Sequence, residues 1–190
     1  MLSPTHLLLA SATILLFASC EDDHLDAYEK PITSMFYVLT PDSGQKVILS
    51  FIDNDGVGGQ PALVNTATLK ANTTYRGELT IGMLNLMASP RLEHFIDSTS
   101  VASEPELHQV FFTPMNGLKI SVTYSDMDAN GNPIGMQTTL QTGQISLGEL
   151  QIAVIHSPDK LGRNVQNGDR TYAKGTIDAE AIFTVKIASD

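Results

Sequence analysis

Two sets of side chains in this sequence have the types and spacing to hold a metal ion. The first is Asp126, Asp128 and Asn130, which place oxygen atoms at alternate positions around a glycine-containing turn. Such oxygens can converge on a hard cation, so the set predicts a calcium site. The turn begins like an EF-hand loop, but it lacks the glutamate at the twelfth position. An ordinary Asx-rich hairpin turn is the alternative, which this departure favours, and the turn at residues 53–55 has the same two interpretations.

The second set combines imidazole and carboxylate, which suit zinc, copper or iron. Strand alternation places Glu106 and His108 on one face, and His156 ends a later strand. His94 precedes this set in a polar segment without clear periodicity. The sequence contains no His-x-His or His-Glu-x-x-His spacing, so convergence of Glu106, His108 and His156 depends on the fold. Histidines without a ligand, at strand ends and in loops, are the alternative interpretation.

Patterns typical of catalysis are missing from the sequence. There is no Gly-x-Ser-x-Gly elbow, and no spacing of acids indicates a general acid–base pair. The formal net charge of −10, with scattered lysines and arginines, argues against nucleic acid and anionic lipid headgroups as partners. We therefore expect a protein that is not an enzyme, and the only cofactors that the sequence suggests are Ca²⁺ or a transition metal at the two sets above.

Strands with a period of two must position these side chains. Residues 118–124 alternate apolar and polar side chains, and residues 134–140 do so again after a turn that contains Asn130-Gly131. This pattern predicts one long β-hairpin with a single apolar face, which needs a second layer to cover it.

Further strands are predicted at short spacing along the chain, separated by Gly, Asn and Pro turns: 32–40, 47–52, 63–69, 74–87, 106–113, 145–156 with a bulge at Gly148, and 177–187. The sequence thus predicts an all-β protein, a single antiparallel β-sandwich of immunoglobulin-like or transthyretin-like type with about 8 strands. We expect the long polar loops to gather at the ends of the sandwich, where such scaffolds carry function: 53–61, 88–105 and 157–173.

The N-terminus reads as a targeting segment. Residues 1–19 carry no charged side chain, and small residues directly before Cys20 resemble the lipobox of bacterial lipoproteins. We expect cleavage before Cys20, the only cysteine, and its lipidation, the alternative being a free thiol in a secreted protein. The acidic residues 20–31 are predicted to be a tether, and residues 32–190 the β-sandwich domain. The acidic run also resembles the export signal of surface lipoproteins of Bacteroidota.

Five segments resemble a group of small β-rich lipoproteins of Bacteroidota: Leu69–Tyr75, Glu106–Phe112, Asp128–Gly135, His156–Lys160 and Asn167–Asp169. The resemblance covers most of residues 45–187. Members often carry the label "type 1 periplasmic binding fold superfamily", but that fold needs two α/β lobes, which this β-rich pattern contradicts. The group has no assigned function, so the resemblance implies no catalytic residues. Analogy with other surface lipoproteins implies a role beside an outer-membrane TonB-dependent receptor.

From these observations we expect a protein that is lipid-anchored at the outer membrane, exposed at the surface or facing the periplasm. The leading hypothesis is a non-enzymatic binding module for a small ligand, a metal or a membrane receptor. The main alternative is a structural or adhesive surface protein without a small ligand. A hydrolase with a carboxylate site built from loops is the third hypothesis.

Overall fold

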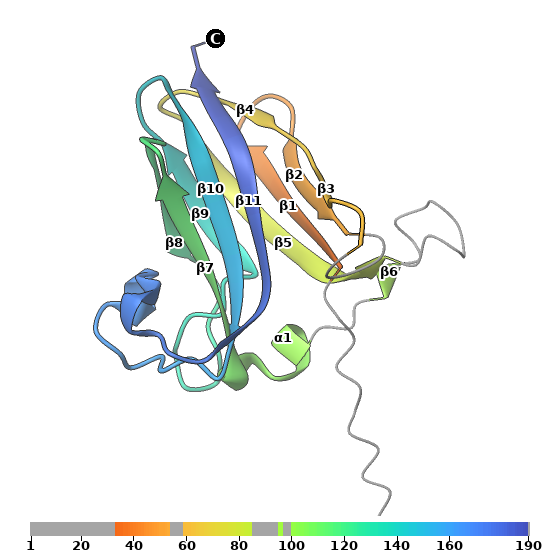
Figure 1. Cartoon of the computed structure of the whole chain (residues 1–190). Coiled ribbons are helices and arrows are strands. Elements are labelled where there is room, and N and C mark those ends of the chain that lie inside the picture. The colour runs from red at the N-terminus through yellow and green to blue at the C-terminus, as the bar shows by residue number, and fades with distance from the viewer. Residues whose placement is uncertain (1–32, 54–58, 85–94, 97–99, 190) are drawn as a thin grey trace, which may run out of the picture.

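The computed structural model describes residues 33–53, 59–84, 95–96 and 100–189 (Figure 1). The predicted leader, Cys20, the acidic tether and His94 lie outside these ranges. Within them, no helix combines the length and the apolar character needed to cross a bilayer.

Two β-sheets pack face to face in the described part of the chain (Figure 1). The first sheet has the order β3-β2-β1-β5-β9-β8, and β6 pairs with the end of β5. All of its pairs are antiparallel. Its strands are β1 (Ser34–Pro41), β2 (Val47–Ile52), β3 (Leu63–Val64), β5 (Thr74–Leu84), β6 (Phe95–Ile96), β8 (Ile120–Tyr124) and β9 (Gln137–Thr142).

The second sheet has the order β4-β11-β10-β7. Its strands are β4 (Ala67–Lys70), β7 (His108–Met115), β10 (Ser146–His156) and β11 (Thr176–Ala188). The long strand β10 pairs antiparallel with β7 and β11, whereas β4 joins β11 in parallel. The prediction of an all-β sandwich is confirmed. Strands outnumber the expected eight partly because the predicted strand 63–69 splits into β3 and β4, which join different sheets.

Inward-facing side chains of both sheets form one hydrophobic core, as the alternating patterns require. Tyr37 lies at its centre, fully buried, and its ring is tilted against that of Phe112 at 5.1 Å between centroids. The Tyr37 hydroxyl and Thr138 Oγ1 are 2.7 Å apart, so these two buried hydroxyls satisfy each other. Burial raises the pKa of Tyr37 above its ordinary value, and the hydrogen bond with Thr138 only partly opposes this.

The segment 157–175 folds back over the outer face of the second sheet. It contains two short 3-10 helices, η3 (Val165–Asn167) and η4 (Arg170–Tyr172). Val165 and Ala173 of this segment form a second, smaller cluster with buried side chains of β7 and β10: Phe111, Ala153 and Ile155. The polar loop predicted at 157–173 is therefore packed against the sheet by apolar side chains.

The predicted strand 106–113 begins later than expected. Residues Pro105–Leu107 form a 3-10 helix, η2, which follows the short helix α1 (Ser100–Ser103), and β7 starts at His108. Proline is favoured at the first position of a helical turn because it has no backbone N–H group that would be left unpaired there. Glu106 is consequently exposed in η2, and the prediction that it shares a strand face with His108 is wrong.

The predicted hairpin is present, but its second strand starts at Gln137. Ile134 instead accepts a hydrogen bond from Val110 of β7 through its carbonyl group. The bulge predicted at Gly148 is also misplaced, since Gly148 pairs regularly with Val185. A Cβ atom at Gly148 would lie 2.6 Å from backbone atoms of Met115 and Leu118, so close packing explains this glycine.

Candidate metal centre

Two histidines from neighbouring strands meet at one end of the second sheet. His108 begins β7 and His156 ends β10, and the antiparallel register places them directly opposite each other. Their rings are edge to face at 4.7 Å between centroids, with His156 Nδ1 2.9 Å from His108 Nε2. Both residues have the strand parity of core residues such as Val110 and Val154, so they continue the inner face to its edge.

A β-bulge adds a carboxylate to this pair. Val154 of β10 is opposite Ala179 of β11, but the next residue, Ile155, is opposite Ile177, so Asp178 is an extra residue without an opposite neighbour. A bulge bends its strand and redirects a side chain. Asp178 Oδ2 lies 3.4 Å from His108 Nε2 and 4.0 Å from His156 Nδ1.

The three donor atoms have a separation suited to a transition metal. Ligands bound tetrahedrally at about 2.0–2.1 Å are about 3.3–3.4 Å apart. The observed separations of 2.9, 3.4 and 4.0 Å lie around this value, so small movements would bring all three donors into bonding range of one ion. Among the described residues, His108, His156 and Asp178 form the one group of three metal-ligating side chains at such distances.

The backbone holds His108 in the orientation that a ligand needs. His108 Nδ1 is 3.0 Å from the carbonyl oxygen of Glu104. A carbonyl oxygen only accepts, so Nδ1 is the donor, which leaves Nε2, the atom that faces the other two residues, as the nitrogen that can offer a lone pair to a metal. Metal-binding histidines commonly carry such an outer hydrogen bond, which fixes both tautomer and ring orientation.

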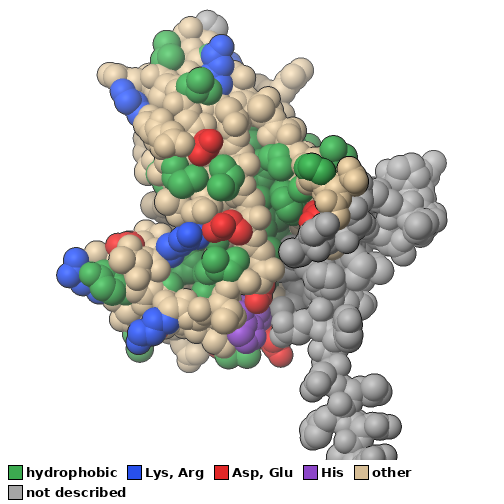
Figure 2. Space-filling model, in the orientation of Figure 1, with side chains coloured by type: hydrophobic (Ala, Val, Ile, Leu, Met, Phe, Trp, Pro, Cys, Tyr) green, Lys and Arg blue, Asp and Glu red, His purple; other side chains and the backbone are tan. Residues whose placement is uncertain are grey.

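Burial differs across the cluster. The His108 side chain is fully buried, whereas those of His156 and Asp178 are 29% and 21% exposed. Figure 2 shows histidine atoms reaching the lower surface of the molecule beside acidic side chains, and the described part of the chain contains no other histidines. The cluster is therefore closed on the protein side and accessible from solvent past His156 and Asp178.

Sequence reasoning found two members of this group and missed the third. The structure brings His108 and His156 together, as that hypothesis required, but exposed Glu106 is not in the group. Regular alternation in the predicted strand 177–187 would put Ile177 on the core face and Asp178 on the outer face, yet Ile177 is 55% exposed. The bulge between them reverses the parity, and the pattern of residue types gives no sign of it.

The predicted calcium ligands have other partners in the structure. The Asp126 carboxylate accepts three backbone hydrogen bonds of 2.8–3.0 Å, from the amides of Gly135, Met136 and Gln137. The backbone N–H of Asn130 donates to Asp128 Oδ1 at 2.9 Å. These contacts are those of an Asx-type turn that connects β8 to β9.

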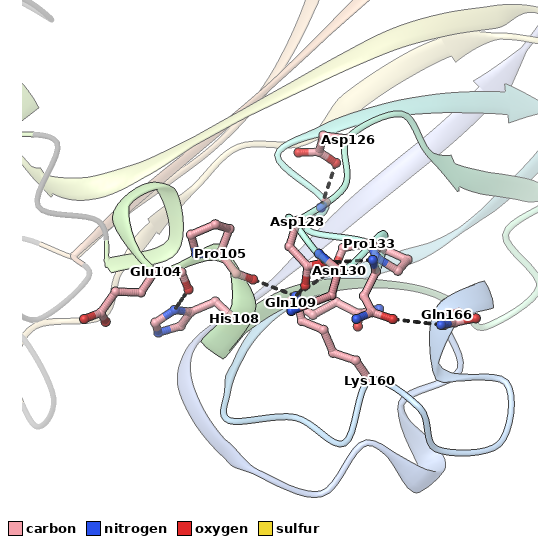
Figure 3. A network of polar contacts seen from close by, with 12 residues as sticks. Glu104, Pro105, His108, Gln109, Asp126, Asp128, Asn130, Pro133, Lys160 and Gln166 are labelled. Atoms are coloured by element: carbon pink, nitrogen blue, oxygen red, sulfur yellow. Dashed lines mark hydrogen bonds and ion pairs between the residues drawn. The ribbon is translucent and has the colours of Figure 1, made fainter.

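Asp128 faces a lysine in place of a free cation (Figure 3). Lys160 Nζ donates to Asp128 Oδ2 at 2.9 Å and to the carbonyl oxygens of Pro105 and Pro133 at 2.6 and 3.2 Å. Burial alone would raise the pKa of Asp128. Hydrogen bonds from the backbone N–H of Asn132 and from the Lys160 ammonium group outweigh burial and hold that pKa below its ordinary value. The ammonium group thus occupies the position on this carboxylate that a calcium ion would need.

The second acidic turn can be placed only in part. The backbone N–H of Asp53 donates to the carbonyl oxygen of Thr33, while Asn54 and Asp55 lie outside the described residues.

No protein-family model, no curated protein and no solved structure matches this chain. The resemblance to small lipoproteins of Bacteroidota therefore stays a prediction.

Proposed function

We propose that this protein is a non-enzymatic metal-binding module that takes a divalent transition metal such as zinc or copper at His108, His156 and Asp178. The observation that supports it is the convergence of three donor atoms from three adjacent strands within 4.0 Å of one another. Imidazole nitrogen and carboxylate oxygen are donors that these metals share, and the partly buried outer hydrogen bond between His108 and the Glu104 carbonyl group adds the usual second layer.

The rigid surroundings of the site also favour specific binding. The donors come from strands of a packed sheet, and ligands on such elements are held more accurately than ligands on loops. In the absence of metal, the His156 Nδ1–H group can donate to His108 Nε2. Metal binding would replace this proton, because a metal ligand must offer its lone pair.

We also propose that the module is anchored at the outer membrane through a lipid on Cys20. This proposal is supported by the apolar leader and the lipobox-like residues before Cys20. The metal site would then lie on a tethered domain, where capture of an ion for an outer-membrane receptor is the role that fits both features.

Isothermal titration of the purified protein with Zn²⁺ tests the metal proposal. We expect saturation at one ion per chain and an affinity at least about 10-fold weaker in Asp178→Asn and His156→Gln, since each loses one of three ligands. Both residues are partly exposed, so these changes spare the core.

Glu106→Gln is the matched control, because it removes a nearby exposed carboxylate that is not in the group. Its affinity should equal that of the unaltered protein. Equal affinities in all four proteins, or a loss confined to Glu106→Gln, would rule out His108, His156 and Asp178 as the site.

A further inference from the structure

We propose that the metal held by His108, His156 and Asp178 keeps an exchangeable coordination position that binds a small anionic donor such as a carboxylate. This inference rests on the proposed function and adds to it the class of ligand that the metal would take. It distinguishes a site that forms ternary complexes from a closed structural site.

The number of protein ligands supports this proposal. Structural zinc sites are closed by four protein ligands, whereas sites with three protein ligands carry an exchangeable fourth. The group at the edge of the second sheet supplies three such side chains among the described residues. All three come from one sheet, and no other described histidine, cysteine, aspartate or glutamate joins the group as a fourth ligand.

The difference in burial indicates where that donor would enter. His108 is fully buried and lies on the protein side of the ion, while His156 and Asp178 both reach solvent. A small molecule can therefore approach the metal between His156 and Asp178 without displacing the core beneath His108.

Charge determines the kind of donor that is favoured. A divalent ion bound by two neutral imidazoles and one carboxylate carries a net charge of +1. A single negative charge on the fourth ligand neutralises this complex, so an anion is favoured over a neutral donor of similar size.

Cobalt substitution tests the proposal directly. The probe is Co²⁺, whose visible absorption changes with coordination number and donor type, titrated in the loaded protein with sodium azide and then with sodium acetate. We expect a saturable shift of the cobalt bands with each anion and no shift with sodium perchlorate at equal ionic strength. Co²⁺ measured after dialysis must stay bound throughout, and Glu106→Gln must respond as the unaltered protein does.

The outcomes separate this inference from the proposed function. If the cobalt absorption bands do not shift with either anion while Co²⁺ stays bound, the inference alone is overturned, since the fourth coordination position would then be closed by the protein. Failure of Co²⁺ to bind would contradict the proposed function itself.

Discussion

Lys160 is the residue whose role differs most from what the sequence suggests. Its side chain is only 5% exposed, and its ammonium group joins Asp128 to the carbonyls of Pro105 and Pro133, which belong to different segments. It thereby connects η2, the turn between β8 and β9, and the segment 157–175 (Figure 3). A lysine in a polar loop carries no signal of this, since most such lysines are solvated.

Replacing Lys160 by methionine should destabilise the protein strongly. Asp128 would remain buried without its cation, and breaking a buried pair in this way costs about 3–5 kcal/mol. Urea denaturation gives the change in the free energy of unfolding. Lys174→Met is the control, because Lys174 pairs with Asp159 at the same kind of distance but is 77% exposed, where such pairs contribute about 0–1 kcal/mol. Equal losses of unfolding free energy in the two variants would show that the buried Lys160–Asp128 pair contributes no more than the exposed Lys174–Asp159 pair.

The lowered pKa of Asp128 makes its contribution depend on pH. The folded state holds this pKa below that of the unfolded chain, about 3.9, so the unfolded state binds the proton more readily. The stabilisation is therefore fully present above about pH 4 and is lost as pH falls through the folded-state pKa. The difference in unfolding free energy between the unaltered protein and Asp128→Asn should shrink below about pH 4. A difference that stays constant from pH 7 to pH 3 would contradict this.

At the scale of elements, strand alternation was sufficient to place most side chains but not those of the metal centre. It correctly put His108 and His156 on core-facing strand positions, because each strand keeps its period of two to the end. It failed for Glu106, where Pro105 starts a 3-10 turn, and for Asp178, where the bulge shifts the register. Both failures occur at strand ends, where contacts between strands decide the backbone path and residue type alone does not.

Gly175 directly precedes β11 and packs against the end of β10, so a substitution there can disturb the metal centre without removing a ligand. Its φ is +72°, and a Cβ atom there would collide with the carbonyl oxygen of His156 and lie 2.8 Å from Ile155 Cγ2. We expect Gly175→Ala to destabilise the protein by more than about 2 kcal/mol and to weaken Zn²⁺ binding by displacing His156.

Gly131→Ala separates the two effects of that change. Gly131 has a similar φ of +78°, but an added Cβ would meet nothing within 4 Å. It should therefore show only the backbone cost of about 1 kcal/mol, with Zn²⁺ affinity unchanged. Chemical denaturation and Zn²⁺ titration of both variants give the comparison, and equal effects would argue against the close packing at His156.

For the whole molecule, composition and periodicity predicted the all-β sandwich because core side chains such as Leu79, Leu140 and Val185 alternate with polar neighbours along their strands. The sequence could not show which strands become neighbours, and so could not show that β7, β10 and β11 meet at one edge. It also could not show that the segment 157–175 covers the second sheet, since this depends on Val165 and Ala173 packing in one cluster with Phe111.

The proposed anchor makes a prediction about the whole protein. Cys20→Ser should abolish incorporation of radiolabelled palmitate and move the protein from the membrane fraction to the soluble fraction, because several acyl chains on one residue hold a protein firmly to a bilayer. A change distant from the leader, such as Glu106→Gln, serves as the control for expression. Membrane association that survives Cys20→Ser would contradict a lipid anchor at this residue.

Anomalous diffraction from zinc-loaded crystals tests the central claim most directly, because it locates the ion without reference to any variant. We predict one strong peak within about 2.0–2.2 Å of His108 Nε2, His156 Nδ1 and Asp178 Oδ2. A peak at Asp126 and Asp128, or none at the two histidines in crystals that contain bound zinc, would contradict the assignment of this strand edge as the metal centre.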